Sequence, residues 1–243
     1  VLGYRFNHQH PNRCVEVGLL HSFSSIMRGE DLSHLVGANA MIHRWDIVTI
    51  GNLSRNRYWG EGDERAVRPA LCTCTFIDGR GFRLVVDPSL ADREKMEAEL
   101  GRRTGLELHE VSAIFVTHAH GDHHAGLPHF ADAVWFAAPG VAEAINKTGK
   151  YPKPVLPASG TILEGIDVIA TPGHTPDHHS LRFSWNNRSV VVAGDAVMTQ
   201  DFWRHRQGYF NSVDSAVAAA TMEHLASIAD ILVPGHDNYF LVR

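Results

Sequence analysis

The sequence predicts a layered fold of sheets and helices, of the α/β or α+β class. Short apolar runs bounded by turn residues recur along the chain, and helical patterns lie between them. The chain has 243 residues, of which 44% are hydrophobic and 20% charged. These values are ordinary for a globular protein that is long enough to bury a sizeable core.

The first forty residues differ from the rest of the chain. These residues show no consistent helix or strand pattern apart from a weak helical one over 17–27. A clear strand pattern begins at Met41 and continues over 45–50. The histidines of this segment lack the tight spacing of a metal site; they are His8, His10, His21 and His34. We therefore expect an N-terminal extension over residues 1–40 and a core domain over 41–243.

Strands are predicted where short apolar runs lie between turn residues. They are expected over 71–77, 82–86, 114–116, 134–136, 166–170, 181–185, 189–192 and 231–233. The two glycines of residues 78–81 favour a hairpin turn between the first two of these strands. Residues 148–160 contain three prolines and two glycines, so we expect a loop there.

Helices are predicted where apolar residues recur at helical spacing. Residues 90–104 form a charged amphipathic pattern that Gly105 ends, as glycine often does just past a helix. Pro139 can begin a second helix, because its missing N–H has no helical partner at the first position anyway. A third helix is predicted over 213–229, with an apolar face formed by Val217, Thr221, Leu225 and Ile228.

The three cysteines favour a reduced setting. An odd number does not suit a disulfide framework, and Cys72 and Cys74 alternate within an apolar run, so we interpret them as strand packing. No stretch reaches the ~18 apolar residues of a membrane span, and no secretory leader pattern opens the chain. The sequence therefore predicts a cytoplasmic protein that does not associate with membranes.

The formal net charge of −5 disfavours binding to a nucleic-acid backbone. We expect a small-molecule substrate as the partner. The oligomeric state is left open, with a homo-oligomer as one option.

Histidines are numerous, and one run groups several of them. The chain has 17 histidines, and the run Thr-His-Ala-His-Gly-Asp-His-His over 117–124 directly follows the predicted strand 114–116. Its metal-binding residue types follow the spacing H-x-H-x-D-H; they are His118, His120, Asp122 and His123. Neutral imidazole and carboxylate oxygen are ligands that suit zinc, iron or manganese. The run therefore predicts a metal centre.

Three more predicted strands lead into a side chain that can bind metal. His174 follows the strand over 166–170, Asp195 follows 189–192, and His236 follows 231–233. Side chains just past the ends of neighbouring strands can converge at one edge of a sheet, on loops held by a rigid scaffold. The glycines beside these ligands, which include Gly121 and Gly173, allow sharp backbone turns.

Together these motifs resemble the metallo-β-lactamase superfamily, whose α+β fold is a four-layer αββα sandwich. The matching segments occur in the family's order over about residues 45 to 240; they are Val86-Asp87-Pro88, 117–123, 171–175, 193–195 and 234–236. The resemblance implies a metallo-β-lactamase-like hydrolase domain over 41–243. It also implies that one metal is bound by His118, His120 and His174, that a second is bound by Asp122, His123 and His236, and that Asp195 bridges both.

A two-metal centre of this kind predicts hydrolysis. Two divalent cations, in the first place Zn²⁺ with iron or manganese as alternatives, can hold a hydroxide between them by lowering the pKa of water towards about 7. The expected substrate bond is an ester, thioester, lactone or phosphoester. Asp122 is predicted as the catalytic residue that orients the hydroxide and passes its proton to the leaving group. Asp87 is expected to hold a ligand histidine in its tautomer, with a helix or turn cap as the alternative.

Residues near these motifs have less specific roles. We expect His124 to pack or to face solvent, and His178 to be a structural hydrogen-bonding residue. The segments 52–58 and 202–206 either line the substrate pocket or are solvated. These segments contain Arg55, Arg57, Arg204 and Arg206, which are either near the pocket or solvated; whether Arg57, Arg204 or Arg206 contacts substrate is left open.

Differences from known branches of the superfamily reduce the number of activities that we expect. Common β-lactamases of the family have a cysteine where this chain has Asp195, and its lactonases have a tyrosine where this chain has Met198. Only forty residues separate Asp195 from His236, too few for the inserted domain of nucleic-acid-processing members. Seven residues follow His236, so we do not expect the helical domain of glyoxalase II-type thioesterases. Two alternatives to a hydrolase remain: a mononuclear-iron persulfide dioxygenase-like oxidoreductase and, less strongly, a non-catalytic binding module.

Overall fold

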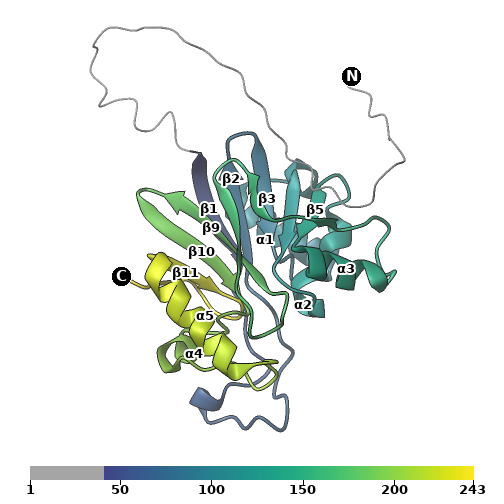
Figure 1. The fold of residues 1–243 in the computed structure, drawn as a ribbon. Helices are drawn as coiled ribbons and strands as arrows, with labels where there is room; N and C mark the ends of the chain where they lie inside the picture. The colour runs from purple at the N-terminus through teal and green to yellow at the C-terminus, as the bar shows by residue number, and fades with distance from the viewer. Residues whose placement is uncertain (1–40) are drawn as a thin grey trace, which may run out of the picture. The chain divides into compact units, whose positions relative to one another are not determined.

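A computed structural model describes residues 41–243, which form two β-sheets flanked by helices (Figure 1). The extension expected over 1–40, with its weak helix and four histidines, lies outside the described residues. The boundary near Met41 therefore stays a prediction. In the described part of the chain, no helix is long and apolar enough to cross a membrane.

The first sheet has six strands in chain order. They are β1 (Ile42–Thr49), β2 (Cys74–Gly79), β3 (Phe82–Val86), β4 (Ala113–Val116), β5 (Val134–Ala137) and β6 (Leu156–Pro157). The first three strands are antiparallel, and the strands from β3 to β6 run parallel. β2 begins later than the sequence predicts, because Leu71 pairs with Asn52 in an isolated bridge. The hairpin between β2 and β3 turns at Gly81, whose φ of 78° favours glycine.

The second sheet also has six strands, in the order β12-β11-β10-β9-β8-β7. They are β7 (Gly160–Leu163), β8 (Ile166–Ala170), β9 (His179–Trp185), β10 (Arg188–Gly194), β11 (Ile231–Pro234) and β12 (Phe240–Leu241). β10 and β11 are parallel, and the other neighbours are antiparallel. The prediction of one loop over 148–160 is wrong at 156–157, because these two residues extend the first sheet as β6.

The helices follow the sequence closely where they are long. They are α1 (Arg93–Thr104), α2 (Gly121–His124), α3 (Pro139–Lys147), α4 (Gln200–His205) and α5 (Ser215–Ile228). Asp92 caps α1 by accepting a hydrogen bond from the Lys95 N–H, and Gly105 ends it in the left-handed conformation. The predicted apolar face of α5 is partly wrong, because Val217 is 37% exposed. The buried face is formed by Ala218, Thr221, Met222 and Leu225.

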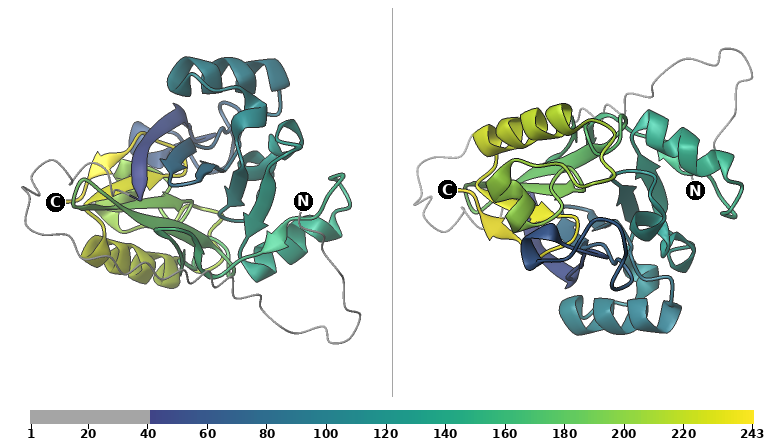
Figure 2. Two further views of the ribbon diagram at one scale, coloured as in Figure 1. Left: turned by 90° about the horizontal axis from the view of Figure 1, so that it is seen from above. Right: turned by 90° about the horizontal axis from the view of Figure 1, so that it is seen from below.

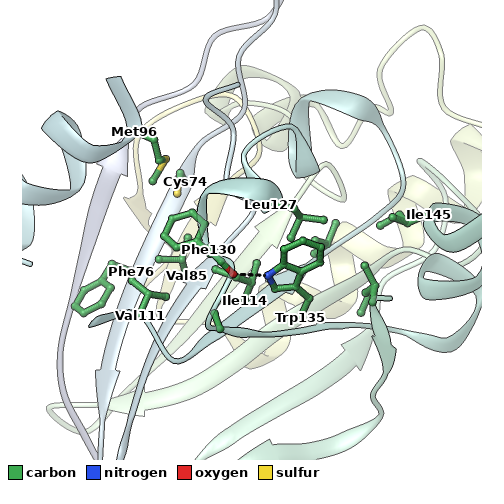
Figure 3. Packing of buried hydrophobic residues seen from close by; sticks show 14 of the residues in the cluster. Cys74, Phe76, Val85, Met96, Val111, Ile114, Leu127, Phe130, Trp135 and Ile145 are labelled. Carbon is green, nitrogen blue, oxygen red and sulfur yellow. Dashed lines mark hydrogen bonds between the residues drawn. The ribbon is translucent and has the colours of Figure 1, made fainter. Parts of the chain in front are cut away.

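Three apolar clusters fill the spaces between the layers of the fold. The first joins the outer face of the first sheet to α1 and α3; there Trp135 is buried, and its indole N–H donates to the Phe130 carbonyl at 2.9 Å (Figure 3). The second fills the space between the two sheets, and includes Phe115 and Val192. The third joins the second sheet to α4 and α5. Figure 2 shows α1 and α5 on opposite sides of the sheets. The predicted α+β, αββα architecture is confirmed.

Candidate metal centre

The seven predicted ligands come from the ends of four strands, and the structure brings them together. The run over 118–123 follows β4, His174 lies on the loop after β8, Asp195 follows β10, and His236 follows β11. The expectation of a single sheet edge is wrong, because β4 belongs to the first sheet and the other three strands to the second. The ligands meet where the ends of two facing sheets come together.

The possible donor atoms form two groups, each with all its atoms within 4.8 Å of one another. One group is His118, His120, His174 and Asp195, and the other is Asp122, His123 and His236. The division matches the one that the family resemblance implies.

Asp195 lies between the two groups. Its Oδ2 is 3.2 Å from His174 Nε2 and 3.6 Å from His118 Nε2. Its Oδ1 is 3.1 Å from His123 Nε2 and 3.3 Å from His236 Nε2. Each carboxylate oxygen therefore faces one group, which is the arrangement that a bridging ligand requires.

Several inward-facing atoms of the centre have no partner within the described residues. His118 Nε2, His123 Nε2 and Asp195 Oδ1 are buried and make no hydrogen bond to any residue of 41–243. Native proteins rarely leave buried polar atoms unpaired. Imidazole nitrogen and carboxylate oxygen are donors for divalent transition metals. The residues present therefore fit a metal centre.

The charge states of three of the candidate ligands suit metal binding. Burial lowers the pKa of His118 well below its ordinary value, and it lowers the pKa of His174 to about 4 although Asp195 opposes this. Burial would raise the pKa of Asp195, but the positive charge of His123 and His236 beside it holds that pKa well below its ordinary value. His118 and His174 are thus neutral at neutral pH and Asp195 is a carboxylate, the forms that bind metals. Burial opposes a charge on His123 and His236, but the negative groups around them, Asp195 among them, raise their pKa, so these two residues would have to release a proton when metal binds.

Asp87 holds one of the candidate ligands in place. Its buried carboxylate accepts hydrogen bonds from the Thr117 N–H at 2.8 Å, from the Thr117 hydroxyl at 2.8 Å, and from His123 Nδ1 at 2.9 Å. A proton on His123 Nδ1 leaves the Nε2 lone pair directed to the centre. The predicted contact between Asp87 and a ligand histidine is confirmed.

The loop between β1 and β2 holds a second candidate ligand. His236 Nδ1 lies 3.0 Å from the Asn52 carbonyl and 2.8 Å from the Leu71 carbonyl. These two residues form the isolated bridge of that loop. The sequence does not reveal this support, because every residue type has a backbone carbonyl.

Two further buried histidines have structural roles. His178 Nδ1 lies 2.9 Å from the Thr171 hydroxyl, and its ring lies 5.0 Å from the ring of His118. His124 packs as predicted, with Nδ1 2.5 Å from the Tyr151 hydroxyl and Nε2 3.2 Å from the Ala119 carbonyl. The contact with Thr171 confirms the hydrogen-bonding role predicted for His178.

Cys72 packs behind the centre. Its Sγ lies 3.2 Å from the Asp122 carbonyl, and burial raises its pKa to about 12. A protonated, buried thiol agrees with the predicted packing role. Cys74 is likewise buried, in the cluster beside α1.

Three arginines whose contact with substrate the sequence left open each pair with a nearby side chain. Arg57 forms an ion pair with Asp63, and Arg206 Nε lies 2.8 Å from Glu223. Arg204 donates to the Gln200 side chain at 3.0 Å and is exposed. These contacts favour a structural role for Arg57 and Arg206 and a solvated position for Arg204.

Comparison with known proteins connects this geometry to a family. The family model described as the metallo-beta-lactamase superfamily matches residues 67–236. This chain belongs to the metallo-beta-lactamase superfamily. It is a metallo-hydrolase of that superfamily, so the predicted family and the predicted enzyme are confirmed.

Its curated relatives are distant. An N-acyl homoserine lactonase from Bacillus sp is 24% identical over 67% of this chain and 68% of the relative. A metallo-beta-lactamase domain-containing protein 1 from Xenopus laevis is 30% identical over 57% of this chain and 59% of the relative. An atrochrysone carboxyl ACP thioesterase from Aspergillus fumigatus is 31% identical over 52% of this chain and 30% of the relative. The match thus spans less than two thirds of the last two.

Solved structures share the fold. A putative metallo-beta-lactamase from Thermotoga maritima has a TM-score of 0.61 and 18% identity, covering 81% of this chain and 98% of that chain. AidC, described as a dizinc quorum-quenching lactonase, has a TM-score of 0.59 and 16% identity, covering 69% of this chain and 72% of that chain.

Proposed function

We propose that this chain hydrolyses a carboxylic acyl bond in an ester, thioester or lactone, with a centre that holds two divalent cations. The position of the Asp195 carboxylate, with one oxygen facing each ligand group, carries the proposal. Two of the three curated relatives named above are a lactonase and a thioesterase, which favours an acyl bond over the phosphoester that the sequence also leaves open. The same names favour hydrolysis over persulfide dioxygenation.

The proposed ligand set divides as the geometry does. His118, His120 and His174 would hold one cation, Asp122, His123 and His236 the other, and Asp195 would contact both. When bound, two divalent cations, in the first place Zn²⁺, supply Lewis acidity that lowers the pKa of water and polarises a carbonyl group.

Asp122 is the carboxylate placed to move a proton. Its side chain is 30% exposed, whereas that of Asp195 is 5% exposed, and its Oδ2 lies 3.6 Å from His236 Nε2. Of the seven proposed ligands, only His120 and Asp122 are partly exposed, so substrate approaches from their side. Asp122 can therefore accept the proton of the attacking water and deliver it to the leaving group.

Metal analysis beside a substrate panel tests the proposal. We expect about two metal ions per chain and turnover of at least one acyl substrate among 4-nitrophenyl acetate, a lactone and an acyl thioester. Turnover of bis(4-nitrophenyl) phosphate alone would contradict an acyl hydrolase. One iron per chain with oxygen consumption on a persulfide would support the dioxygenase instead.

Two variants test the roles of individual residues. His120→Ala should lower metal content and abolish activity while the chain stays folded, because it removes a ligand at the edge of the centre. Asp122→Asn should slow turnover by roughly 10²-fold or more, since it removes the proposed acid and base. His109→Ala changes an exposed histidine outside the ligand set and should alter neither. Full activity in His120→Ala would refute the proposed centre.

A further inference from the structure

Among residues 41–243, Arg55 is a half-buried arginine outside the ligand set that has no ionic partner. The guanidinium carbon of Arg55 lies 3.9 Å from the centre of the Phe210 ring. Its Nε is buried and has no acceptor among residues 41–243, and no carboxylate of these residues pairs with it. By contrast, the nearby Arg57 and Arg68 each form an ion pair, with Asp63 and Glu61.

Arg55 and Phe210 each lie in a segment that is hydrogen-bonded to a proposed metal ligand. The Asn52 carbonyl lies 3.0 Å from His236 Nδ1, and Arg55 follows Asn52 by three residues. The Val213 N–H donates to the carbonyl of His174 at 3.1 Å, and Phe210 precedes Val213 by three residues. Three residues span at most about 11 Å of chain. The arginine and its ring therefore join the two loops that flank the centre on its His174 and His236 sides.

The backbone of Arg55 is hydrogen-bonded to a residue of a buried cluster. The Tyr209 hydroxyl donates to the Arg55 carbonyl at 2.8 Å. Tyr209 itself packs with Leu53, Met198 and Phe202. Met198 follows the proposed bridging residue by three positions, and its carbonyl accepts from the His236 N–H at 2.8 Å. The cationic group is therefore anchored to the same framework as the ligands, which limits the ordering cost of binding to it.

The chemistry of this group favours a carboxylate ligand. A guanidinium stays charged at every relevant pH, and its planar fork matches a carboxylate through two parallel hydrogen bonds. The flat Phe210 ring supports one face of that plane, so the remaining N–H groups are free to meet a ligand in the plane. A partly buried charge without a counterion is costly, and an anionic substrate group would offset that cost.

We propose that Arg55 binds a carboxylate of the substrate, so that this enzyme acts on acyl compounds carrying a second, ionised carboxyl group. The inference rests on the proposed hydrolase function and adds the substrate class to it. Arg55 is a specificity residue here, because it contacts the substrate away from the bond that is cleaved.

Two esters of similar length, one with and one without a terminal carboxylate, separate carboxylate binding from cleavage of the ester bond. Mono(4-nitrophenyl) glutarate carries a terminal carboxylate, and 4-nitrophenyl pentanoate does not. In Arg55→Gln, KM for the glutarate ester should rise about tenfold, the effect of losing ~1.4 kcal/mol of binding. The pentanoate ester should change less than twofold. Arg55→Lys keeps the charge without the fork and should restore part of the loss. Arg204→Gln removes one exposed positive charge from α4 and should leave both esters unchanged.

Direct binding gives a readout that does not depend on turnover. Calorimetry with glutarate on the metal-loaded protein should show at least fivefold weaker binding to Arg55→Gln than to the unmodified chain. Equal affinities, or equal KM values for the glutarate ester, would overturn the role of Arg55 and leave the hydrolase proposal intact. If neither ester is cleaved but Arg55→Gln loses glutarate affinity, the anion site is supported and the esterase activity is contradicted.

Discussion

Asp87 illustrates at the scale of one residue how the centre is prepared for metal. A single buried carboxylate fixes the Thr117 backbone and hydroxyl and orients the ring of His123. The Val-Asp-Pro motif after β3 made this contact predictable. The supports of His236 were not predictable, because they are backbone carbonyls of Asn52 and Leu71. The sequence left the role of Arg55 open together with the rest of 52–58, since its surroundings depend on Phe210, which is distant in sequence.

Replacing Asp87 by Asn should weaken metal binding. An amide offers one acceptor oxygen in place of two, so it cannot accept all three hydrogen bonds. Its NH₂ group would face either the Thr117 N–H or the Thr117 hydroxyl and His123 Nδ1. Loss of such support for a ligand histidine typically lowers metal affinity by about 10- to 100-fold. Competition with a chelator measures this directly. Asp167→Asn is a matched control, since Asp167 pairs with Arg182 on the exposed part of β8 and β9. Equal metal affinity in both variants would contradict the role of Asp87.

At the scale of elements, helix α5 and the loop after β8 position each other. The Asp214 N–H donates to the Gly173 carbonyl at 3.0 Å, and the Asp214 side chain caps α5. The Thr221 hydroxyl donates to the Pro172 carbonyl at 2.7 Å. His174 is therefore held where it is by a helix that follows it by forty residues of chain. Sequence patterns predicted the helix and the loop, but not that they touch.

Gly173 and Gly121 should respond differently to alanine, although both adjoin proposed ligands. Gly173 has a φ of 129°, and an added Cβ would lie 2.4 Å from the backbone of Ala218. A Cβ on Gly121 would meet nothing within 4 Å, and its φ is not positive, so this position does not require glycine. Gly173→Ala should lower the free energy of unfolding by about 2–4 kcal/mol, and Gly121→Ala by about 0.5 kcal/mol or less. Urea denaturation followed by circular dichroism compares them; equal losses would contradict this account.

The length of an element decided how well its sequence predicted it. The strands β3 and β8 have the predicted bounds, because an apolar run between turn residues is a local signal. β6 and β12, of two residues each, exist through pairing with β5 and β11, and no local pattern marks them. The prediction for Val217 was wrong because the buried face of α5 begins at its neighbour Ala218, which leaves Val217 37% exposed beside that face.

At the scale of the whole molecule, periodicity indicated only sheets and helices in layers, while the motifs indicated the αββα arrangement. Which residues face the other sheet depends on contacts between chain segments far apart, such as Phe115 and Val192 in the central cluster. This facing arrangement determines the site. Each ligand group contains residues from loops of both sheets: His118 and His174 in one, His123 and His236 in the other.

Bound metal should therefore stabilise the fold by linking the two sheets. A ligand that binds only the folded state adds about 4 kcal/mol when its free concentration is a thousand times Kd. Chelation should lower the Tm measured by calorimetry, and added Zn²⁺ should restore it. In His120→Ala the loss on chelation should be smaller, because less metal is bound beforehand. An unchanged Tm after metal analysis has verified complete removal would mean that the sheets are held together by the central apolar cluster alone, and that the cations serve only the chemistry.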